Sequence, residues 1–180
     1  MNKRLFIAVD LPDEVNRTLG EYAEVLRDIH WYKPTEYHLT IKFIGDTEQE
    51  RFENIKEVLG QIEHPVFRLK VNRLGYFPPD RHPRVIWAGF EESTALDNLH
   101  QKVEERLFEL GVEKEDRAFT PHVTLGRNKD VPRKRVESYI EKRNDIYIPD
   151  IPVSSFILYS SELSSDGAVH TPEETYSLID

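Results

Sequence analysis

The chain has 180 residues, 33 Asp and Glu against 24 Lys and Arg, and a formal net charge of −9. The length suits one domain with a single core, and with 38% hydrophobic residues the chain is too apolar to be disordered. The chain has no Cys, which excludes disulfides, thiolate nucleophiles and Cys-based zinc sites. It also has no apolar run long enough for a signal peptide or a transmembrane helix. We therefore expect a cytoplasmic protein that does not contact a membrane.

In the first half of the sequence, the spacing of apolar residues predicts strand, helix, strand, helix and strand, in that order. The predicted ranges are a strand at 4–11, a helix at 13–28 whose apolar positions include Leu19 and Val25, a strand at 37–44 closed by Gly45, a helix from a capping box at Thr47 and Glu50 to residue 62, and a strand at 66–74. Residues 31–36 and the Pro-rich residues 76–83 are predicted loops.

From residue 84 the same order of elements starts again. The predicted ranges are a strand at 84–90, a helix at 93–110 that Ser93 opens and Gly111 ends, a strand at 122–127, a helix at 132–142, and strands at 153–159 and 175–179. This repetition indicates an internal duplication, with halves at approximately 1–83 and 84–180. We expect an α+β fold: a single domain, 1–180, with two pseudo-symmetric lobes of antiparallel sheet covered by helices and a central cleft.

Each half carries one short motif, His38-Leu39-Thr40-Ile41 in the first and His122-Val123-Thr124-Leu125 in the second. Two matches to His-x-Thr followed by an apolar residue are about a one-in-a-thousand coincidence for this composition. Residues two apart on a strand point to the same face. His38 and Thr40 should therefore project together, as should His122 and Thr124, while Leu39, Ile41 and Phe43 face the core.

Two imidazoles and two hydroxyls that meet in a cleft suit the hydrolysis of a phosphodiester. One His can take a proton from water while the other protonates the departing oxygen, and Thr hydroxyls are good donors to phosphate oxygens. Divalent-metal sites usually add carboxylates, and neither motif contains one. We therefore expect no metal and no cofactor.

The paired motifs and their surroundings RLFIAVDLP, HLTIKFIGD, RVIWAGF and TPHVTLGR resemble the 2H phosphoesterase superfamily. Within it they resemble the RNA 2′,3′-cyclic phosphodiesterases, historically called 2′-5′ RNA ligases. The resemblance runs from Arg4 to about Leu178. It implies metal-independent hydrolysis of a terminal 2′,3′-cyclic phosphate to a 2′-phosphate, with His38 as proton donor, His122 as proton acceptor, and Thr40 and Thr124 as phosphate ligands.

Two basic residues next to the motifs are candidate substrate ligands. Lys42 lies two residues beyond Thr40, so strict alternation puts it on the catalytic face, where it would offset phosphate charge. Strict alternation turns Arg127 away, but Gly126 would permit a bulge that turns it inward, and the resemblance favours a phosphate-binding Arg there. Five aromatic residues near these strands are candidates for base stacking: Trp31, Tyr32, Tyr76, Phe77 and Phe119.

The expected partners are RNA ends or small cyclic nucleotides, bound by a monomer. The negative net charge argues against a protein that coats long nucleic acid, although residues 127–135 carry five basic residues and one acid. Two alternatives stay open: a 2′-5′ RNA ligase, and a non-catalytic module that binds RNA ends or nucleotides. The intact His and Thr pairs favour the hydrolase, because a binding module would gain more from Arg or Lys at those positions.

Overall fold

The computed structural model describes residues 2–23 and 26–180. In this part of the chain, nine strands, four α-helices and one 3-10 helix follow one another in the order β1 (Lys3–Val9), α1 (Asp13–Ala23), β2 (Ile29–Trp31), η1 (Pro34–Glu36), β3 (Leu39–Thr47), α2 (Gln49–Gly60), β4 (Phe67–Phe77), β5 (Val85–Phe90), α3 (Thr94–Glu109), β6 (His122–Asn128), α4 (Arg133–Lys142), β7 (Ile148–Val153), β8 (Ser155–Ser164) and β9 (Gly167–Ser177). The predicted α+β class is confirmed. Among these residues, no helix combines the length and apolar character needed to cross a membrane.

The strands form one antiparallel sheet in the order β7-β4-β5-β6-β3-β1-β8-β9. Strand β2 pairs with the C-terminal part of β6, beyond the position where β6 meets β3. The order is symmetric about the β6–β3 pair: reading outward, β6, β5 and β4 on one side match β3, β1 and β8 on the other. A duplicated chain produces this order if the last matching strand of each half pairs with the other half: β4 of the first half lies beside β5, and β8 of the second half lies beside β1. At the centre of the sheet, β3 and β6 pair at a single position, Leu39 opposite Val123.

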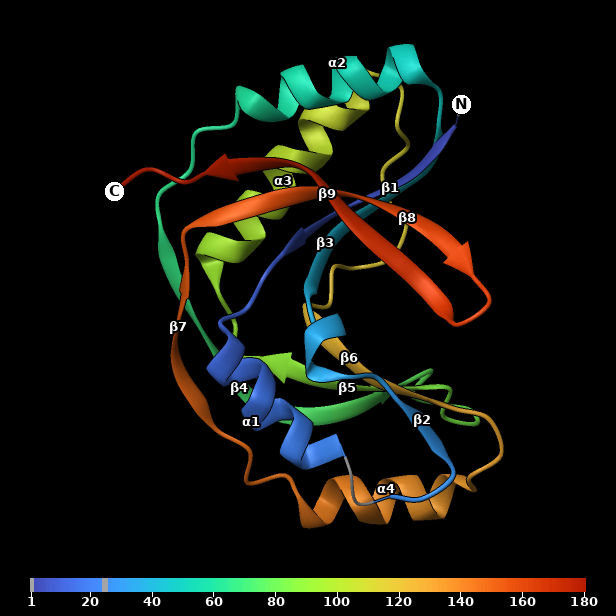
Figure 1. The fold of residues 1–180 in the computed structure, drawn as a ribbon. Coiled ribbons are helices and arrows are strands. Elements are labelled where there is room, and N and C mark those ends of the chain that lie inside the picture. Colours follow the sequence, from blue (N-terminus) through green and yellow to red (C-terminus); the bar gives the residue numbers. More distant parts are fainter. Residues whose placement is uncertain (1, 24–25) are drawn as a thin grey trace.

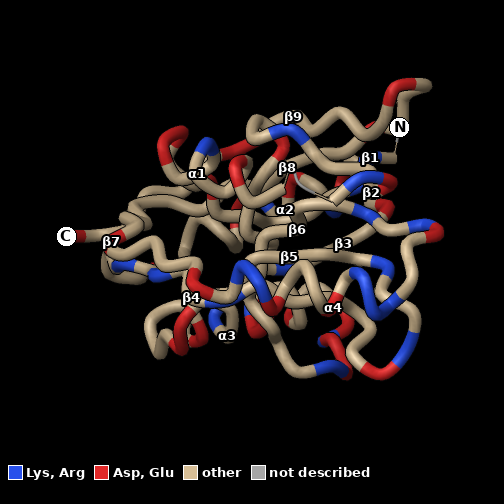
Figure 2. Tube along the Cα trace, turned by 90° about the horizontal axis from the view of Figure 1, so that it is seen from below, with Lys and Arg blue, Asp and Glu red and all other residues tan. Residues whose placement is uncertain are grey.

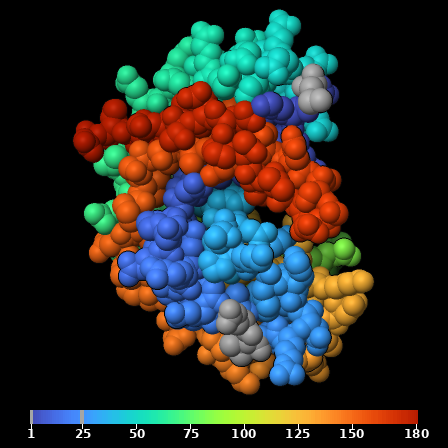
Figure 3. All heavy atoms as spheres, viewed as in Figure 1, coloured from blue at the N-terminus to red at the C-terminus, as the bar shows by residue number. Residues whose placement is uncertain are grey.

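Two lobes meet at this centre (Figure 1). Lobe A consists of β1, β3, β8 and β9 with α2 and α3, and lobe B consists of β2, β4, β5, β6 and β7 with α1 and α4. Each lobe therefore contains elements from both halves of the sequence. The space-filling view shows a hollow between the C-terminal strands, in orange and red, and the light-blue segment that follows α1 (Figure 3).

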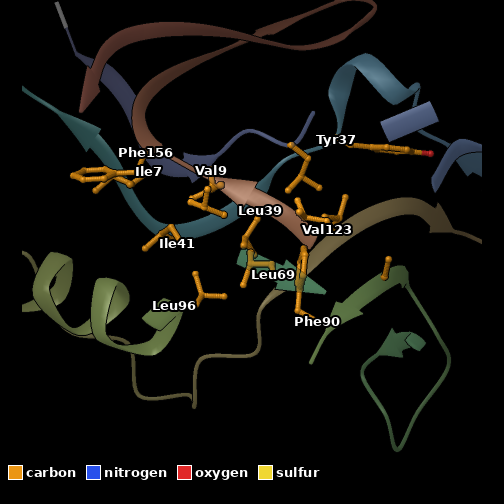
Figure 4. Close-up of a cluster of buried hydrophobic side chains, with 14 of the residues drawn as sticks. Ile7, Val9, Tyr37, Leu39, Ile41, Leu69, Phe90, Leu96, Val123 and Phe156 are labelled. Carbon is orange, nitrogen blue, oxygen red and sulfur yellow. The ribbon is translucent and has the colours of Figure 1, made fainter. Parts of the chain in front are cut away.

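The core lies between the sheet and the helices. Helix α3 begins at Ser93, whose hydroxyl accepts a hydrogen bond from the Leu96 amide at 3.2 Å, and its residues at helical spacing pack on the sheet. Leu39 and Val123, both fully buried, point to this side with Ile7, Val9 and Leu96 (Figure 4). Burial of these apolar faces leaves the opposite face of β3 and β6 to the cleft.

Several predicted boundaries differ from the structure. The helix predicted at 13–28 is described as far as Ala23, the expectation for Val25 lies outside the described residues, and Asp28 has a left-handed backbone with φ 70°. Thr47 does not cap α2: it ends β3 as a buried residue, and its hydroxyl donates to the Gly45 carbonyl at 3.0 Å. Strand β3 also runs through Gly45, which adopts φ 87°, a conformation that glycine tolerates well.

The sequence patterns missed two strands and made three others too short, since β4 continues to Phe77, β8 to Ser164, and β9 begins earlier than predicted. Strand β2 lies between the predicted helix 13–28 and the predicted loop 31–36 and overlaps the loop only at Trp31. Strand β7 contains Pro149 and Pro152, which hide a strand because Pro lacks an amide donor. Strand β9 begins at Gly167, eight residues before the predicted start, because it forms a hairpin with β8 along nearly its whole length. These additions widen the sheet without changing the position of the two motifs.

Candidate active site

The two His-x-Thr motifs lie side by side where the lobes meet. The antiparallel register at Leu39 and Val123 places His38 opposite Thr124 and Thr40 opposite His122, and opposed residues of such strands have Cβ atoms about 5 Å apart. All four side chains are half-buried and lie on the face opposite the core. The structure thus brings together the four residues that the sequence predicted.

Each imidazole is held in the same way by the backbone before its motif. The Nδ1 atom of His38 lies 3.0 Å from the Glu36 carbonyl oxygen, and the Nδ1 atom of His122 lies 2.7 Å from the Thr120 carbonyl oxygen. A carbonyl oxygen can only accept a hydrogen bond, so Nδ1 carries the proton in both rings. The Nε2 atom of each ring is then left to accept a proton in the neutral state or to donate one in the charged state.

Burial lowers the pKa of both imidazoles below their ordinary value, because the interior disfavours the charged form. The pKa of His38 is also lowered by the nearby His170 and, more weakly, by His122, while the Glu36 carbonyl and the Asp10 carboxylate raise it. For His122, the Thr120 carbonyl acts against burial. Within the described residues, a carboxylate therefore favours the charged form of His38 and has no counterpart at His122.

A β-bulge follows Thr40 in β3 and overturns the expectation for Lys42. Thr40 pairs with Ala8 and Lys42 pairs with Ile7, so Ile41 is the extra residue that shifts the register. Lys42 therefore faces α3 instead of the cleft: its side chain is 2% exposed, and its Nζ lies 2.8 Å from Glu104 Oε1. Nζ also donates to the Glu113 carbonyl at 2.9 Å. The structure does not bring Lys42 to the imidazoles.

The same bulge turns Phe43 to the cleft, although strict alternation predicted it in the core. Phe43 is 63% exposed, and its ring centroid lies 6.0 Å from that of Phe6. The exposed ring next to the motif offers a flat apolar surface, which is what a nucleobase stacks on.

A second bulge occurs at the equivalent place in β6, and it acts on Arg127. Thr124 pairs with Trp87 and Gly126 pairs with Ile86, so Leu125 is the extra residue here. Arg127 consequently lies on the same face as His122 and Thr124, is exposed, and donates from Nε to the Tyr32 hydroxyl at 2.6 Å. Phe43 and Arg127 occupy matching positions in the two strands, one apolar and the other cationic.

Aromatic rings fix the two imidazoles from the side. Phe6 and His170 lie against His38, with ring centroids 5.2 and 5.5 Å away, and Phe77 and Trp87 lie against His122, at 5.0 and 6.2 Å. Sequence reasoning missed Phe6, Trp87 and His170, because the first two lie in strands that are apolar throughout and the third adjoins a turn. The pairing of β1 with β3, and of β5 with β6, is what would have revealed the first two.

The other aromatic candidates lie in different surroundings. Phe77 is at His122 and Tyr32 is at Arg127, as described above. Trp31 packs on Tyr139, Tyr76 donates to Glu137 Oε1 at 2.9 Å, and Phe119 stacks on His100 of α3 at 4.0 Å. Two of the five aromatic candidates, Phe77 and Tyr32, thus contact a motif or Arg127.

The fold and the paired motifs together define a phosphoesterase. The family model described as LigT like Phosphoesterase matches residues 9–87 and 90–170, and the chain belongs to this family. A Thermus thermophilus protein named RNA 2′,3′-cyclic phosphodiesterase is 36% identical, over 97% of this chain and 90% of its own length. A Methanocaldococcus jannaschii protein of the same name is 29% identical, over 93% of this chain and 96% of its own. The crystal structure of E. coli LigT in apo form matches the fold with a TM-score of 0.80, at 23% identity over 99% of both chains.

Proposed function

We propose that this protein is an RNA 2′,3′-cyclic phosphodiesterase, which hydrolyses a terminal 2′,3′-cyclic phosphate to a 2′-phosphate. One observation carries the proposal: two imidazoles, each anchored through Nδ1, share one half-buried face with two Thr side chains. The name shared by the relatives from Thermus thermophilus and Methanocaldococcus jannaschii supports the substrate. E. coli LigT, which shares the fold, has been crystallised with 3′-AMP.

In the proposed mechanism, the two histidines divide the proton transfers. His122 Nε2 takes a proton from a water molecule as the water oxygen attacks phosphorus, and the bond from phosphorus to the 3′ oxygen breaks. His38 Nε2, protonated beforehand, gives its proton to the departing 3′ oxygen. One water is consumed, and the product carries a 2′-phosphate and a 3′-hydroxyl. No step needs a metal ion.

The assignment of donor and acceptor rests on the resemblance to the family, in which the first motif supplies the donor. Asp10 acts in the same sense, because it raises the pKa of His38, although burial and His170 lower that pKa by more. Thr40 and Thr124 lie on the same face as the rings, each opposite one of the two histidines, where their hydroxyls would donate to the phosphate oxygens as negative charge develops. Arg127, on the same face, would supply a cation for the phosphate. We leave Lys42 out of the proposed site.

The direct test is incubation with a nucleoside 2′,3′-cyclic phosphate in the presence of a strong chelator, with the product identified by phosphorus NMR. A 2′-phosphate as the sole product is expected. A 3′-phosphate would refute the proposed leaving group, and activity that requires an added divalent ion would refute the two-histidine mechanism. Adding an RNA with a free 5′-hydroxyl to the same reaction tests ligation, which would give a 2′-5′ linkage.

We also propose that the protein acts as a monomer in the cytoplasm. The complete set of catalytic groups comes from one chain, and a chain without Cys suits a reducing compartment. Light scattering at working concentration and fractionation of cells test these two statements separately.

A further inference from the structure

A small hollow at one end of lobe B is lined almost entirely by basic residues. It has a volume of about 270 Å³, and its walls are His82, Arg84, Arg127, Asn128 and Lys129. No carboxylate lines it. This is unusual for a chain with a net charge of −9, in which Lys and Arg are interspersed with Asp and Glu along most of the trace (Figure 2).

The hollow is held in shape by hydrogen bonds of a buried amide. Asn128 is 7% exposed; its Nδ2 donates to the Pro83 and Val131 carbonyls at 2.7 and 2.9 Å, and its Oδ1 accepts from the Val131 amide at 2.9 Å. The ring Nε2 of His82 lies 3.1 Å from the Lys129 carbonyl. These contacts fix the segments before β5 and after β6 to each other, so the basic side chains start from a rigid base.

The cations of the hollow have no anionic partner among the residues that the structure describes. In the described part of the chain, Arg84, Arg127 and Lys129 form no ion pair with any Asp or Glu. Three unpaired cations around one hollow repel one another, and a bound polyanion would remove this repulsion. Guanidinium groups in particular match the geometry of phosphate oxygens.

Arg127 connects the hollow to the candidate active site. It lines the hollow, and the bulge places it on the same face of β6 as His122 and Thr124. Arg127 lies three residues beyond Thr124, but the bulge reduces this to two residue steps of the partner strand, from Trp87 to Val85, or about 7 Å. A stacked nucleic-acid strand advances about 3.4 Å per nucleotide, so this distance corresponds to about two nucleotides.

We propose that the hollow binds the backbone phosphates of RNA on the 5′ side of the terminal cyclic phosphate. This inference rests on the proposed function and makes it more specific: the preferred substrate is an RNA oligomer of about three or four nucleotides or more, rather than a cyclic mononucleotide. Arg127 serves both the terminal phosphate and the backbone, whereas Arg84 and Lys129 serve the backbone alone.

The test compares kcat/KM for uridine 2′,3′-cyclic phosphate and for a uridine tetranucleotide that ends in the same group. The wild type is expected to prefer the tetranucleotide by about 10-fold or more, with a steep dependence on salt. The double variant Arg84→Gln/Lys129→Gln should lose most of this preference and keep its activity on the mononucleotide within about 2-fold. Its plot of log kcat/KM against log salt for the tetranucleotide should be shallower by about 1.4, since each single-strand phosphate contact contributes about 0.7.

Lys134→Gln is the matched control, because it removes one charge from the neighbouring helix α4 without touching the hollow. It should keep both the tetranucleotide preference and the salt slope. A 5′-phosphorylated uridine 2′,3′-cyclic phosphate distinguishes a general phosphate site from an RNA-backbone site, since a gain as large as that of the tetranucleotide would contradict the need for several nucleotides.

The inference is overturned if the wild type hydrolyses both substrates equally well, or if the double variant loses activity on both or on neither. If the wild type hydrolyses no cyclic phosphate at all, the proposed function fails by itself. Binding of a fluorescent tetranucleotide with a 2′-phosphate end, measured by anisotropy, then still decides about the hollow, because the double variant should bind it about 10-fold more weakly.

Discussion

Replacing Lys42 by Met separates the role that the sequence suggested for this residue from the one that the structure gives it. In the structure its ammonium pairs with Glu104, whose side chain is 9% exposed, and donates to the Glu113 carbonyl. Removing one partner of a buried ion pair costs about 3–5 kcal/mol, because the remaining charge stays buried and uncompensated. His100 lies 3.6 Å from Glu104, but burial lowers the pKa of His100, so at neutral pH it is a weak substitute for the lost ammonium.

For a chain of this size, such a loss corresponds to a fall in Tm of about 6–20 °C. Urea unfolding followed by circular dichroism measures the free energy of unfolding, and kcat/KM is measured at a temperature where the variant is still folded. We expect a large loss of stability with kcat and KM close to wild type. The double variant Lys42→Met/Glu104→Leu should recover most of the stability, since a buried pair replaced by apolar residues is often neutral or stabilising.

Lys70→Met provides the control, because Lys70 pairs with Glu91 at 3.1 Å with both side chains about half exposed. An exposed pair contributes about 0–1 kcal/mol, so this variant should remain close to wild type. If instead Lys42→Met keeps full stability and raises KM about 10-fold or more, its ammonium contacts the substrate and the structural assignment is refuted.

The remaining predictions concern the site itself. His38→Ala and His122→Ala should each lower kcat by about 10²–10⁴. An activated aryl phosphodiester that the cleft accepts should restore the activity of His38→Ala alone, because such a leaving group departs without an acid. Restored activity of His122→Ala instead would exchange the two roles. Since burial holds the pKa of both rings below the ordinary 6.5, the bell-shaped pH profile of kcat/KM should peak below that value. Stability should also fall as pH drops through that range, because the unfolded chain then binds more protons than the folded one; stability that stays level or rises on acidification would contradict the lowered pKa values. A Cβ at Gly75 would lie 2.3 Å from the ring of Trp87, which lies against His122. Gly75→Ala should therefore lower the free energy of unfolding by about 1–3 kcal/mol and lower kcat as well. An unchanged kcat would show that the ring does not position the imidazole.

Patterns with a short period predicted the centre of the site. The two motifs each span four residues, the period of a strand is two, and both strands are apolar on the other face, so the positions of His38, Thr40, His122 and Thr124 followed from local rules. That the two motifs meet in a cleft followed from the repetition of the same order of elements in the two halves, whereas their pairing as neighbouring strands of one sheet did not.

Features that depend on a neighbouring strand escaped prediction. A bulge shifts the register by one residue through pairing with the next strand, so the alternation within β3 alone gave the wrong side for Lys42 and Phe43. In β6, Gly126 hinted at the second bulge, since glycine often marks one. The contact of His170 with His38 depends on a hairpin that brings together residues far apart in the sequence, and no local pattern encodes it.

The exchange of strands between the halves has a consequence for how the protein is made. Strand β1 is synthesised first, yet it lies between β3 and β8, with Phe6 opposite Tyr159. Lobe B has all of its strands once Val153 has been added, whereas lobe A must wait for β8 and β9. Until then β1 presents an unpaired apolar edge, which is prone to pair with other chains. Truncation before residue 155 would make that exposure permanent, so early termination should yield aggregates rather than a functional lobe.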